Sequence, residues 1–330
     1  MRERIKATTL AFYRRVGWHR IGIAVGIVIV VFALTTLVRL LRDIKIDKVI
    51  VALRSTSVHD ALLALGFIAA SYVTLTFYDH FALRMIGRRD VPYRVAAMAS
   101  FISYTIGHNL GATVFTGGAI RFRIYSAWGL GLVDVARIAF VTGLTFWLGN
   151  VFVLGIGMSW VPEAASAINQ LPPWINRFIG LAGLLVIMGY LVWLLPQTRV
   201  VGRANWRITL PSVRLTLVQI GIGVLDLGAG SLAMCALLPA DPPIDFVTFM
   251  VTFVTATLLG FLSHAPGSLG VFEAAMLVAL PQFQTEALLA SLLIFRVLYF
   301  LLPFCLAILM LSARESWLAA RTATNSSANP

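Results

Sequence analysis

Long apolar runs separated by short polar segments dominate the sequence. A helix rises 1.5 Å per residue, so about 18 apolar residues can cross the roughly 30 Å hydrocarbon core of a membrane. Six runs are predicted to span it: Ile21–Val38, Ala61–Leu83, Ile138–Met158, Phe178–Leu195, Leu215–Leu238 and Ala287–Leu311. Two further runs, Val95–Ile120 and Phe246–Leu280, are apolar but interrupted by Gly, Pro and polar residues.

The distribution of Lys and Arg decides how these runs cross the membrane, because cytoplasmic loops carry an excess of both. With a cytoplasmic N-terminus and eight simple spans, the arginine-rich loop 196–214 would lie outside and the acidic loop 241–245 inside. The conflict disappears if each interrupted run returns to its side of entry, which places 19 of the 26 Lys and Arg in the cytoplasm. The fold class is therefore predicted as an all-α integral membrane protein with about six spans, two re-entrant or broken hairpins and both termini cytoplasmic.

Composition excludes a soluble protein. Only 12% of the residues are charged and 59% are hydrophobic, with a mean hydropathy of +0.88, whereas soluble domains carry about 25% charged residues. The net charge of +12 lies in short runs between apolar segments, which favours anionic headgroups over nucleic acid as the partner. Cys235 and Cys305 lie in apolar runs with no metal or disulfide spacing, so both are expected to be small buried hydrophobic residues.

A pattern of polar residues occurs twice. An aspartate, a His-x-x-Gly element and an Arg-x-x-aromatic element follow one another as Asp79, His108 and Arg137, and again as Asp226, His264 and Arg296. The two copies begin on opposite sides of the membrane, as in the inverted repeats of secondary transporters. We therefore predict a basic cytoplasmic N-terminus (1–20) that leads into a retained first span, two membrane repeats (21–160 and 175–312) and a polar C-terminal tail (313–330).

Charges at mid-depth need an explanation, because a central charge in a membrane helix costs about 2.5–3.5 kcal/mol. Asp226 and Arg296 both lie near the middle of their spans. They are predicted either to form a structural salt bridge with each other or to line a polar cavity. The two interpretations overlap, since a substrate can open such a pair.

The second interrupted run contains HAPGSLGVFE, residues 264–273. Pro266 has no amide hydrogen to leave unpaired, and Gly267 and Gly270 allow backbone or a headgroup to approach closely, so we expect a hairpin tip here. The bare glycine amides are expected to accept an anion. Glu273 is predicted to pair with a cation or to take up a proton, and His264 is either a site residue or a buried histidine with satisfied hydrogen bonds.

The first interrupted run contains His108 and Asn109, and Arg121 and Arg123 follow it. These two arginines, expected on an inward-facing loop, either bind lipid phosphate or simply follow the positive-inside rule. His108 has the same two interpretations as His264. Asp79 lies near the end of its span and is either a headgroup-level polar residue or part of the site, and the same holds for His80 and Arg84.

Several chemistries lack their motifs. The sequence contains no phosphate-binding G-x-x-x-x-G-K-[ST], no H-E-x-x-H, no C-x-x-C and no G-x-S-x-G. His264 and Glu273 have no nucleophile beside them in sequence. We therefore expect no cofactor, no metal and no ATP-driven transport within this chain, and a translocase rather than an enzyme. Gly143, Gly149 and Gly155 are candidates for close helix packing, including packing in a homo-oligomer.

Three segments of the chain are distinctive: NLGATVFTGGAIRFRIYSAWGL, HAPGSLGVFEAAM and LLIFRVLYFLLPF. They resemble the membrane region of the lysylphosphatidylglycerol synthase/flippase family, also called the multiple peptide resistance factor family. Pro266 to Glu273 is the most specific element, followed by Arg296, Tyr299 and Pro303. The resemblance covers residues 10 to 312 approximately, and no soluble aminoacyltransferase domain follows in this sequence.

The resemblance implies a lipid flippase in the bacterial inner membrane that moves aminoacylated phosphatidylglycerol, or a related phospholipid, between leaflets, a function linked to antimicrobial peptide resistance. Arg296 is expected to attract the phosphate. Asp226 and Glu273 are expected to face the amine, or to pair with Arg296 when the groove between the hairpins is empty. The alternatives are a membrane subunit or enzyme of lipid or glycolipid modification that works with a separate lipid-modifying enzyme, and a small-solute secondary transporter. Synthase activity is not expected from the membrane region.

Overall fold

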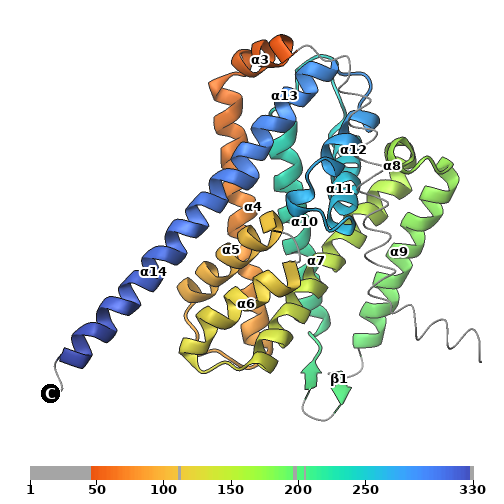
Figure 1. Ribbon diagram of the computed structural model, residues 1–330. Helices are drawn as coiled ribbons and strands as arrows, with labels where there is room; N and C mark the ends of the chain where they lie inside the picture. The colour runs from red at the N-terminus through yellow and green to blue at the C-terminus, as the bar shows by residue number, and fades with distance from the viewer. Residues whose placement is uncertain (1–45, 111–112, 196–198, 204–205, 328–330) are drawn as a thin grey trace, which may run out of the picture.

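The computed structural model describes residues 46–110, 113–195, 199–203 and 206–327, and is mostly helical. Five helical segments in this part of the chain are long and apolar enough to cross a membrane (Figure 1). They are α4 (Val58–Met85), α7 (Leu132–Trp160), α9 (Pro173–Leu194), α10 (Val213–Cys235) and the continuous segment Thr285–Trp317. All five coincide with predicted spans, whereas the predicted span Ile21–Val38 lies outside the described residues.

The helices begin a few residues before the apolar runs that predicted them because polar residues cap them. The Ser57 side chain accepts a hydrogen bond from the His59 amide at the start of α4, and Ser212 accepts one from the Leu215 amide at the start of α10. An N-cap satisfies a backbone amide that the helix itself leaves unpaired. Hydropathy alone therefore underestimates the length of a span whose ends reach polar surroundings.

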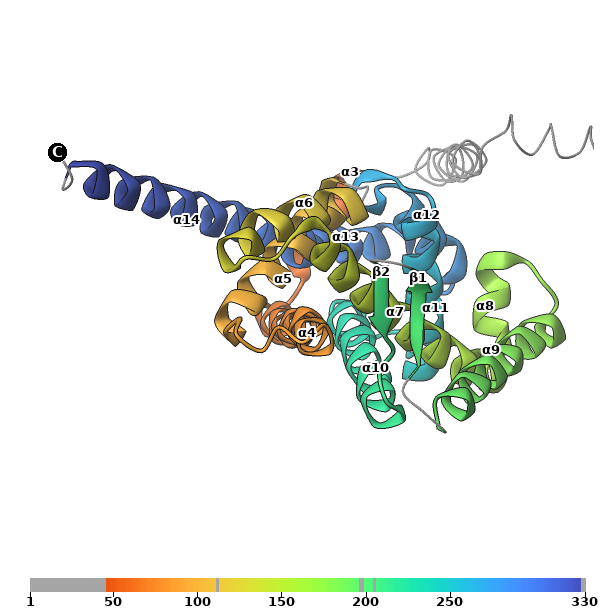
Figure 2. The same cartoon turned by 90° about the horizontal axis from the view of Figure 1, so that it is seen from below.

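Short elements connect and flank the long helices. One end of the molecule carries α3 (Ile46–Ser55) and α8 (Pro162–Asn169). The other end carries an antiparallel pair of strands, β1 (Val200–Arg203) and β2 (Trp206–Thr209), in which Val200 faces Thr209 (Figures 1 and 2).

Both interrupted runs form helical hairpins. The first hairpin consists of α5 (Tyr93–Leu110) and α6 (Thr113–Tyr125), followed by a short turn, η1 (Ser126–Trp128). The second consists of α11 (Phe246–Leu262), the turn η2 (Pro266–Ser268) and α12 (Val271–Ala279). The first hairpin enters and leaves at the end that carries β1 and β2, the second enters and leaves at the opposite end, and their tips point to the middle (Figure 1). This is the geometry that the charge distribution predicts.

The order long helix, two short helices, long helix therefore occurs twice. In the first half it is α4, α5, α6 and α7. In the second half it is α10, α11, α12 and the last span, which consists of α13 (Thr285–Arg296), η3 (Val297–Leu301) and α14 (Leu302–Ser327). Helices α4, α7 and α10 pack against one another in the centre, and α9 lies outside α7 (Figure 2).

Glycine allows the closest helix crossing in the core. A Cβ atom on Gly149 of α7 would lie 2.7 Å from the Gly223 Cα of α10, so a larger residue would force the two backbones apart. Gly155 packs in the same way against α9, where a Cβ atom would lie 3.3 Å from the Gly180 carbonyl oxygen. A Cβ atom on Gly143 would meet no described residue within 4 Å, so the packing role predicted for it is not seen in the described part of the chain.

The outer surface is apolar. Phe178, Leu185 and Val186 of α9 are 69%, 71% and 70% exposed, which suits a helix whose outer face contacts lipid rather than water. Cys305 on α14 is also exposed, so the prediction that both cysteines are buried is wrong for this one. Hydropathy does not distinguish burial in protein from contact with lipid, because both favour apolar residues.

The last span is interrupted at its middle by one turn of π-helix, η3. Pro303 follows this turn and has no amide hydrogen to donate to the carbonyl four residues earlier, that of Tyr299. The Tyr72 hydroxyl of α4 donates to this Tyr299 carbonyl over 2.9 Å. The Asn109 side-chain amide of the first hairpin donates to the next carbonyl, that of Phe300, over 3.4 Å. Side chains of the first half thus satisfy the backbone opened in the second half, as a membrane interior requires.

Candidate functional site

A small cavity lies at the centre of the molecule, where the two hairpin tips meet. Its volume is about 100 Å³, and phenylalanine rings form much of its wall. Its polar lining comes from both hairpins and from the spans around them: Tyr104, His108, Asp226, Thr257, Ser268 and Tyr299. His108 belongs to the tip of the first hairpin and Ser268 to the tip of the second.

Asp226 is a buried carboxylate whose hydrogen-bond donors are neutral. It projects from α10, is 8% exposed, and accepts hydrogen bonds from the Ser71 hydroxyl (2.6 Å) and the Tyr78 hydroxyl (3.4 Å) of α4. The Tyr299 hydroxyl lies 3.2 Å from Ser71 Oγ and extends this network to the last span. No Lys, Arg or His in the described part of the chain forms an ion pair with Asp226.

Arg296 pairs with Glu273 and not with Asp226. Its Nε atom donates to Glu273 Oε1 over 2.6 Å and its Nη2 atom donates to the same oxygen. The predicted salt bridge between Asp226 and Arg296 is therefore wrong, whereas the prediction that Glu273 pairs with a cation, and with Arg296 when no lipid is bound, is confirmed. Arg296 lies directly before the π-turn, and Glu273 lies on α12 of the second hairpin. The packing of α12 places Glu273, and not Asp226, in contact with the guanidinium group.

The same pair holds the tip of the second hairpin. Arg296 Nη1 donates to the Gly267 carbonyl over 2.8 Å, and Glu273 Oε2 accepts from the Gly270 amide over 2.8 Å. The Gly270 amide is thus occupied by the protein's own carboxylate, which corrects the prediction that it is bare and open to an anion. The pair is partly accessible, with side-chain exposures of 17% for Arg296 and 9% for Glu273.

The tip adopts a strained backbone. Gly267 and Gly270 have φ values of 58° and 79°, as their predicted role at a tip requires. His264 and Ser268 also have positive φ, at 55° and 54°, which non-glycine residues rarely adopt. The His264 side chain is exposed and its Nδ1 atom lies 2.9 Å from the Leu262 carbonyl oxygen, so it is neither the buried histidine nor the cavity residue that the sequence suggested.

A second ion pair ties the first hairpin to α4. Arg121 of α6 donates from Nε and Nη2 to Asp79, at 2.8 to 3.1 Å, and the Tyr125 hydroxyl donates to the same carboxylate over 2.8 Å. The Arg121 guanidinium lies over the Tyr104 ring, 5.0 Å from its centre. Asp79 is fully buried, so it is not the headgroup-level residue that was one of its two interpretations. Arg121 is 5% exposed and lies within α6, so it is not on the inward-facing loop expected for it.

The remaining predicted site residues separate into two groups. His108 and Asn109 lie at the tip of the first hairpin, where the Asn109 side chain also donates to the Thr105 carbonyl over 2.8 Å. The two tips are close, since a Cβ atom on Gly267 would lie 3.9 Å from the Asn109 carbonyl oxygen. Arg123 instead lies far along α6, where it forms an exposed ion pair with Glu315 of α14.

Sequence reasoning missed the pairing of Asp79 with Arg121 and the network around Ser71. One signal was present in the sequence. Ala64, Ser71 and Ala82 are small residues in an apolar run, and Asp79 falls on the same helical face. Small residues on one face of a membrane helix mark contact with another helix, so this face identifies Asp79 as buried.

The sequence has relatives among known proteins, although no protein-family model matches it. It is 30% identical over 253 residues to the uncharacterized protein slr0712 of Synechocystis sp., covering 76% of this chain and 78% of the relative. It is 27% identical over 266 residues to the inner membrane protein YbhN of Escherichia coli, covering 77% and 80%. It is 24% identical over 296 residues to the phosphatidylglycerol lysyltransferase of Staphylococcus aureus, covering 86% of this chain but 32% of the enzyme.

The chain belongs to the lysylphosphatidylglycerol synthase/flippase family. It matches the membrane region of that family and about a third of the length of the lysyltransferase. Five membrane-capable helices and the similarity to YbhN make it a multi-pass membrane protein. This homology supports a membrane lipid-related role for the protein.

Proposed function

We propose that this protein moves a phospholipid headgroup between membrane leaflets through the central cavity, with lysylphosphatidylglycerol or a related lipid as the substrate. One observation carries the proposal. Two hairpins that enter from opposite ends meet at mid-depth beside a buried acid, and a hydrogen-bonded ion pair holds the tip of one of them. A site of this kind is reachable in turn from either end if each hairpin moves separately.

The charges suit a headgroup that carries both signs. The phosphate is an anion, and the guanidinium of Arg296 is the partly accessible cation beside the cavity. The aminoacyl amine is a cation, and Asp226 is a buried carboxylate served only by neutral donors. A lipid phosphate that replaces Glu273 at Arg296 separates the carboxylate that holds the Gly270 amide from the guanidinium that holds the Gly267 carbonyl, so headgroup binding and opening of the tip are coupled.

The cavity volume indicates which state the structure represents. Its 100 Å³ hold about three water molecules at roughly 30 Å³ each, whereas small-molecule sites occupy about 300–1,000 Å³. The structure is therefore a closed state, and the two hairpin tips must separate before a headgroup enters. The contacts that must break are those of Arg296 with the Gly267 carbonyl and of Asn109 with the Phe300 carbonyl.

Alternating access follows if the two halves form an inverted repeat. The repeated element order and the opposite entry of the hairpins support this assignment (Figure 1). We place the end that carries β1 and β2 in the cytoplasm of a bacterial inner membrane, because the loops there carry most of the Lys and Arg. Both termini are then cytoplasmic.

Leaflet exchange in liposomes tests the proposal. Fluorescent phosphatidylglycerol and its lysylated form are placed in vesicles with the purified chain, and a membrane-impermeant quencher reports the outer fraction over time. We expect exchange that is faster with the lysylated lipid and at least tenfold slower in Arg296→Gln. Arg177→Gln, which removes an exposed arginine at the start of α9, is the matched control and is expected to exchange lipid normally.

Two results would overturn the proposal. Normal exchange by a folded Arg296→Gln protein removes this residue from the site. No exchange of either lipid by well-folded wild-type protein removes the transport function and favours a subunit that presents lipid to a separate modifying enzyme, in which case the lipid changes mass only when that enzyme is added.

A further inference from the structure

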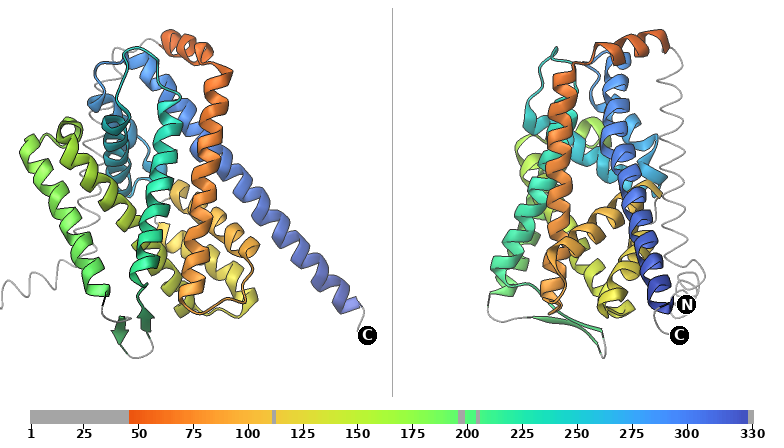
Figure 3. Two further views of the ribbon diagram at one scale, coloured as in Figure 1. Left: turned by 180° about the vertical axis from the view of Figure 1, so that it is seen from behind. Right: turned by 90° about the vertical axis from the view of Figure 1, so that its left-hand side faces the viewer.

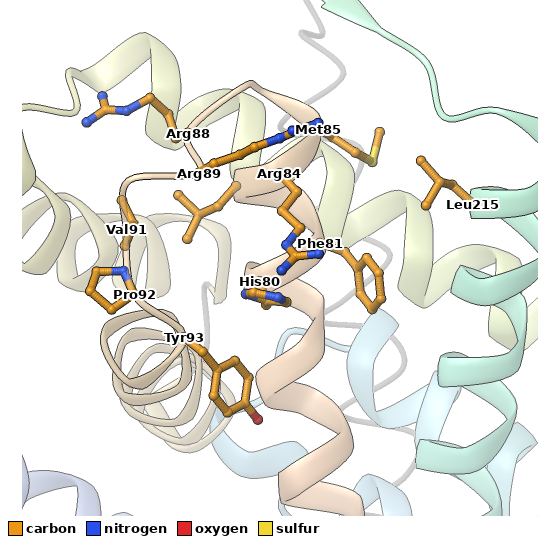
Figure 4. A pocket seen from close by; sticks show the side chains of 11 residues that line it. His80, Phe81, Arg84, Met85, Arg88, Arg89, Val91, Pro92, Tyr93 and Leu215 are labelled. Carbon is orange, nitrogen blue, oxygen red and sulfur yellow. The ribbon is translucent and has the colours of Figure 1, made fainter.

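Outside the central site, an arginine-rich pocket lies at the end of α4. It has a volume of about 630 Å³ and is lined by His80, Arg84, Arg88, Arg89 and Tyr93 together with apolar residues (Figure 4). Figure 4 shows Arg84 on the last turn of α4 and Arg89 in the turn that follows, while Arg88 extends away from both. We call this the arginine pocket.

Most of the positive charge in this region is not neutralised by the protein. Arg88 is already paired within the protein, since it donates two hydrogen bonds to Asp90, each 2.9 Å long, and contacts the Trp128 carbonyl. The same contact lowers the pKa of the Asp90 carboxyl and keeps it ionised. The guanidinium groups of Arg84, Arg89 and the neighbouring Arg94 are exposed and form no hydrogen bond or ion pair with any described residue.

An apolar groove begins beside this pocket. It has a volume of about 560 Å³ and lies between α4, α5 and the last span, where Ala69, Val73, Leu302, Leu306 and Met310 contribute to its walls. Beyond these contacts α14 runs away from the bundle, so the groove is open on the outer surface (Figures 2 and 3). Arg94 is the one charged residue among those that line it.

The groove and the arginine pocket follow one face of α4. Ala69, Val73 and Thr76 line the groove, and His80 and Arg84 continue the same helical stripe into the pocket. The Thr76 and Tyr93 hydroxyls, one from each site, lie 2.6 Å apart. From Leu65 to Thr76 the groove follows twelve residues of α4, an axial rise of about 16 Å at 1.5 Å per residue step, which is close to half of the roughly 30 Å hydrocarbon core.

We propose that the groove holds one acyl chain of an anionic phospholipid whose phosphate is bound by Arg84, Arg89 and Arg94. The positive charge of the three arginines complements the phosphate, and the length of the apolar groove matches that of an acyl chain in one leaflet. A zwitterionic lipid fills the groove equally well, but its own cation opposes the three free arginines. The proposal goes beyond the proposed function, since it assigns a binding site for an unmodified anionic lipid of the adjoining leaflet, separate from the path of an aminoacylated lipid through the central cavity.

Binding, rather than transport, tests this proposal. The full chain in detergent is titrated with phosphatidylglycerol or phosphatidylcholine of identical acyl chains, and bound lipid is counted by native mass spectrometry. We expect phosphatidylglycerol to bind more tightly. In Arg89→Gln/Arg94→Gln its affinity is expected to fall about 25-fold, because each basic residue near a membrane surface contributes about fivefold. The matched control Arg54→Gln/Arg177→Gln, which removes two exposed arginines at the opposite end, is expected to stay within about twofold.

A second pair of variants tests the groove. Ala69→Trp fills the groove, whereas Ala70→Trp places the same side chain on the next position of α4, which does not line it. We expect Ala69→Trp to weaken the binding of phosphatidylglycerol and Ala70→Trp to leave it unchanged. Soluble glycerophosphoglycerol tests the headgroup alone and is expected to bind at least a hundredfold more weakly than the lipid.

Three results would overturn the proposal: equal affinity for the two lipids, unchanged binding by Arg89→Gln/Arg94→Gln, or a soluble headgroup that binds as tightly as the lipid. Failure of this site and failure of transport are distinguishable. Selective lipid binding without leaflet exchange removes the transport function alone, and exchange that continues without selective binding removes the docking site alone.

Discussion

The two hairpins contain the same ingredients but use them differently. In the first hairpin, Arg121 is sealed against Asp79, and the two side chains are 6% and 0% exposed. In the second hairpin, Glu273 and Arg296 are 9% and 17% exposed, and the pair also holds the backbone of the tip. The pair of Asp79 and Arg121 fixes the first hairpin to α4. The pair of Glu273 and Arg296 holds the backbone of the second hairpin's tip in place beside the cavity.

This difference indicates that an ion pair inside a membrane protein need not be part of its mechanism. A pair that is almost completely buried has little surface to offer a ligand, and removal of one partner leaves an unpaired buried charge. A pair that is partly accessible and shares hydrogen bonds with a strained turn can exchange partners. We therefore expect loss of folding from the first pair and loss of function from the second.

The largest expected effect is on the first pair. Arg121→Ala leaves Asp79 buried without its cation, and we expect a loss of about 3–5 kcal/mol in the free energy of unfolding. Arg123→Ala, two residues along α6, removes an arginine whose ion pair with Glu315 is exposed, and we expect a much smaller change in stability because solvent screens such a pair. Unfolding of both variants in mixed micelles measures the contrast, and equal stabilities would remove the anchoring role of Arg121.

A smaller effect on stability but a large one on transport is expected at the second pair. Glu273→Gln keeps a side-chain oxygen for the Gly270 amide but loses the charge opposite Arg296. We expect about 1–3 kcal/mol of destabilisation, the range for a hydrogen bond to a charged group, and leaflet exchange reduced at least tenfold. A variant that unfolds as readily as Arg121→Ala would show that the second pair is also an anchor, and the comparison between the hairpins would fail.

The smallest effect is expected at His264. The side chain is exposed at the tip and bonds only within its own turn, so His264→Ala is expected to change stability by about 0.5 kcal/mol or less and to leave exchange unchanged. The same liposome assay measures this. A clear loss of exchange would return His264 to the site and show that the tip moves this side chain into the cavity when it opens.

Much of the architecture could be predicted from the sequence because a membrane restricts it strongly. Backbone groups in hydrocarbon must pair within their own segment, so a long apolar run is a helix wherever it occurs. The distribution of Lys and Arg reports the side on which each loop lies, which is how the two hairpins were predicted before any contact was known. The glycines at positions 267 and 270 also indicated the tip correctly, since each adopts a positive φ.

The pairing of charges could be predicted only in part. The sequence offered both Asp226 and Glu273 as partners of Arg296, and depth in the membrane did not distinguish between them. In the structure, α12 brings Glu273 to Arg296, α6 brings Arg121 to Asp79, and Asp226 is left with Ser71 and Tyr78. Depth specifies one coordinate of a side chain, whereas an ion pair requires contact in all three.

The sequence by itself therefore determined which segments cross the membrane, which turn back and where the tips lie, because the bilayer selects for hydropathy, length and charge along a single axis. The tertiary structure alone decided which acid meets which arginine, which pair is sealed and where a groove opens beside the free arginines. Those outcomes depend on the rotation and lateral packing of the helices about that axis, and a pattern of apolar residues that faces both lipid and protein does not specify them.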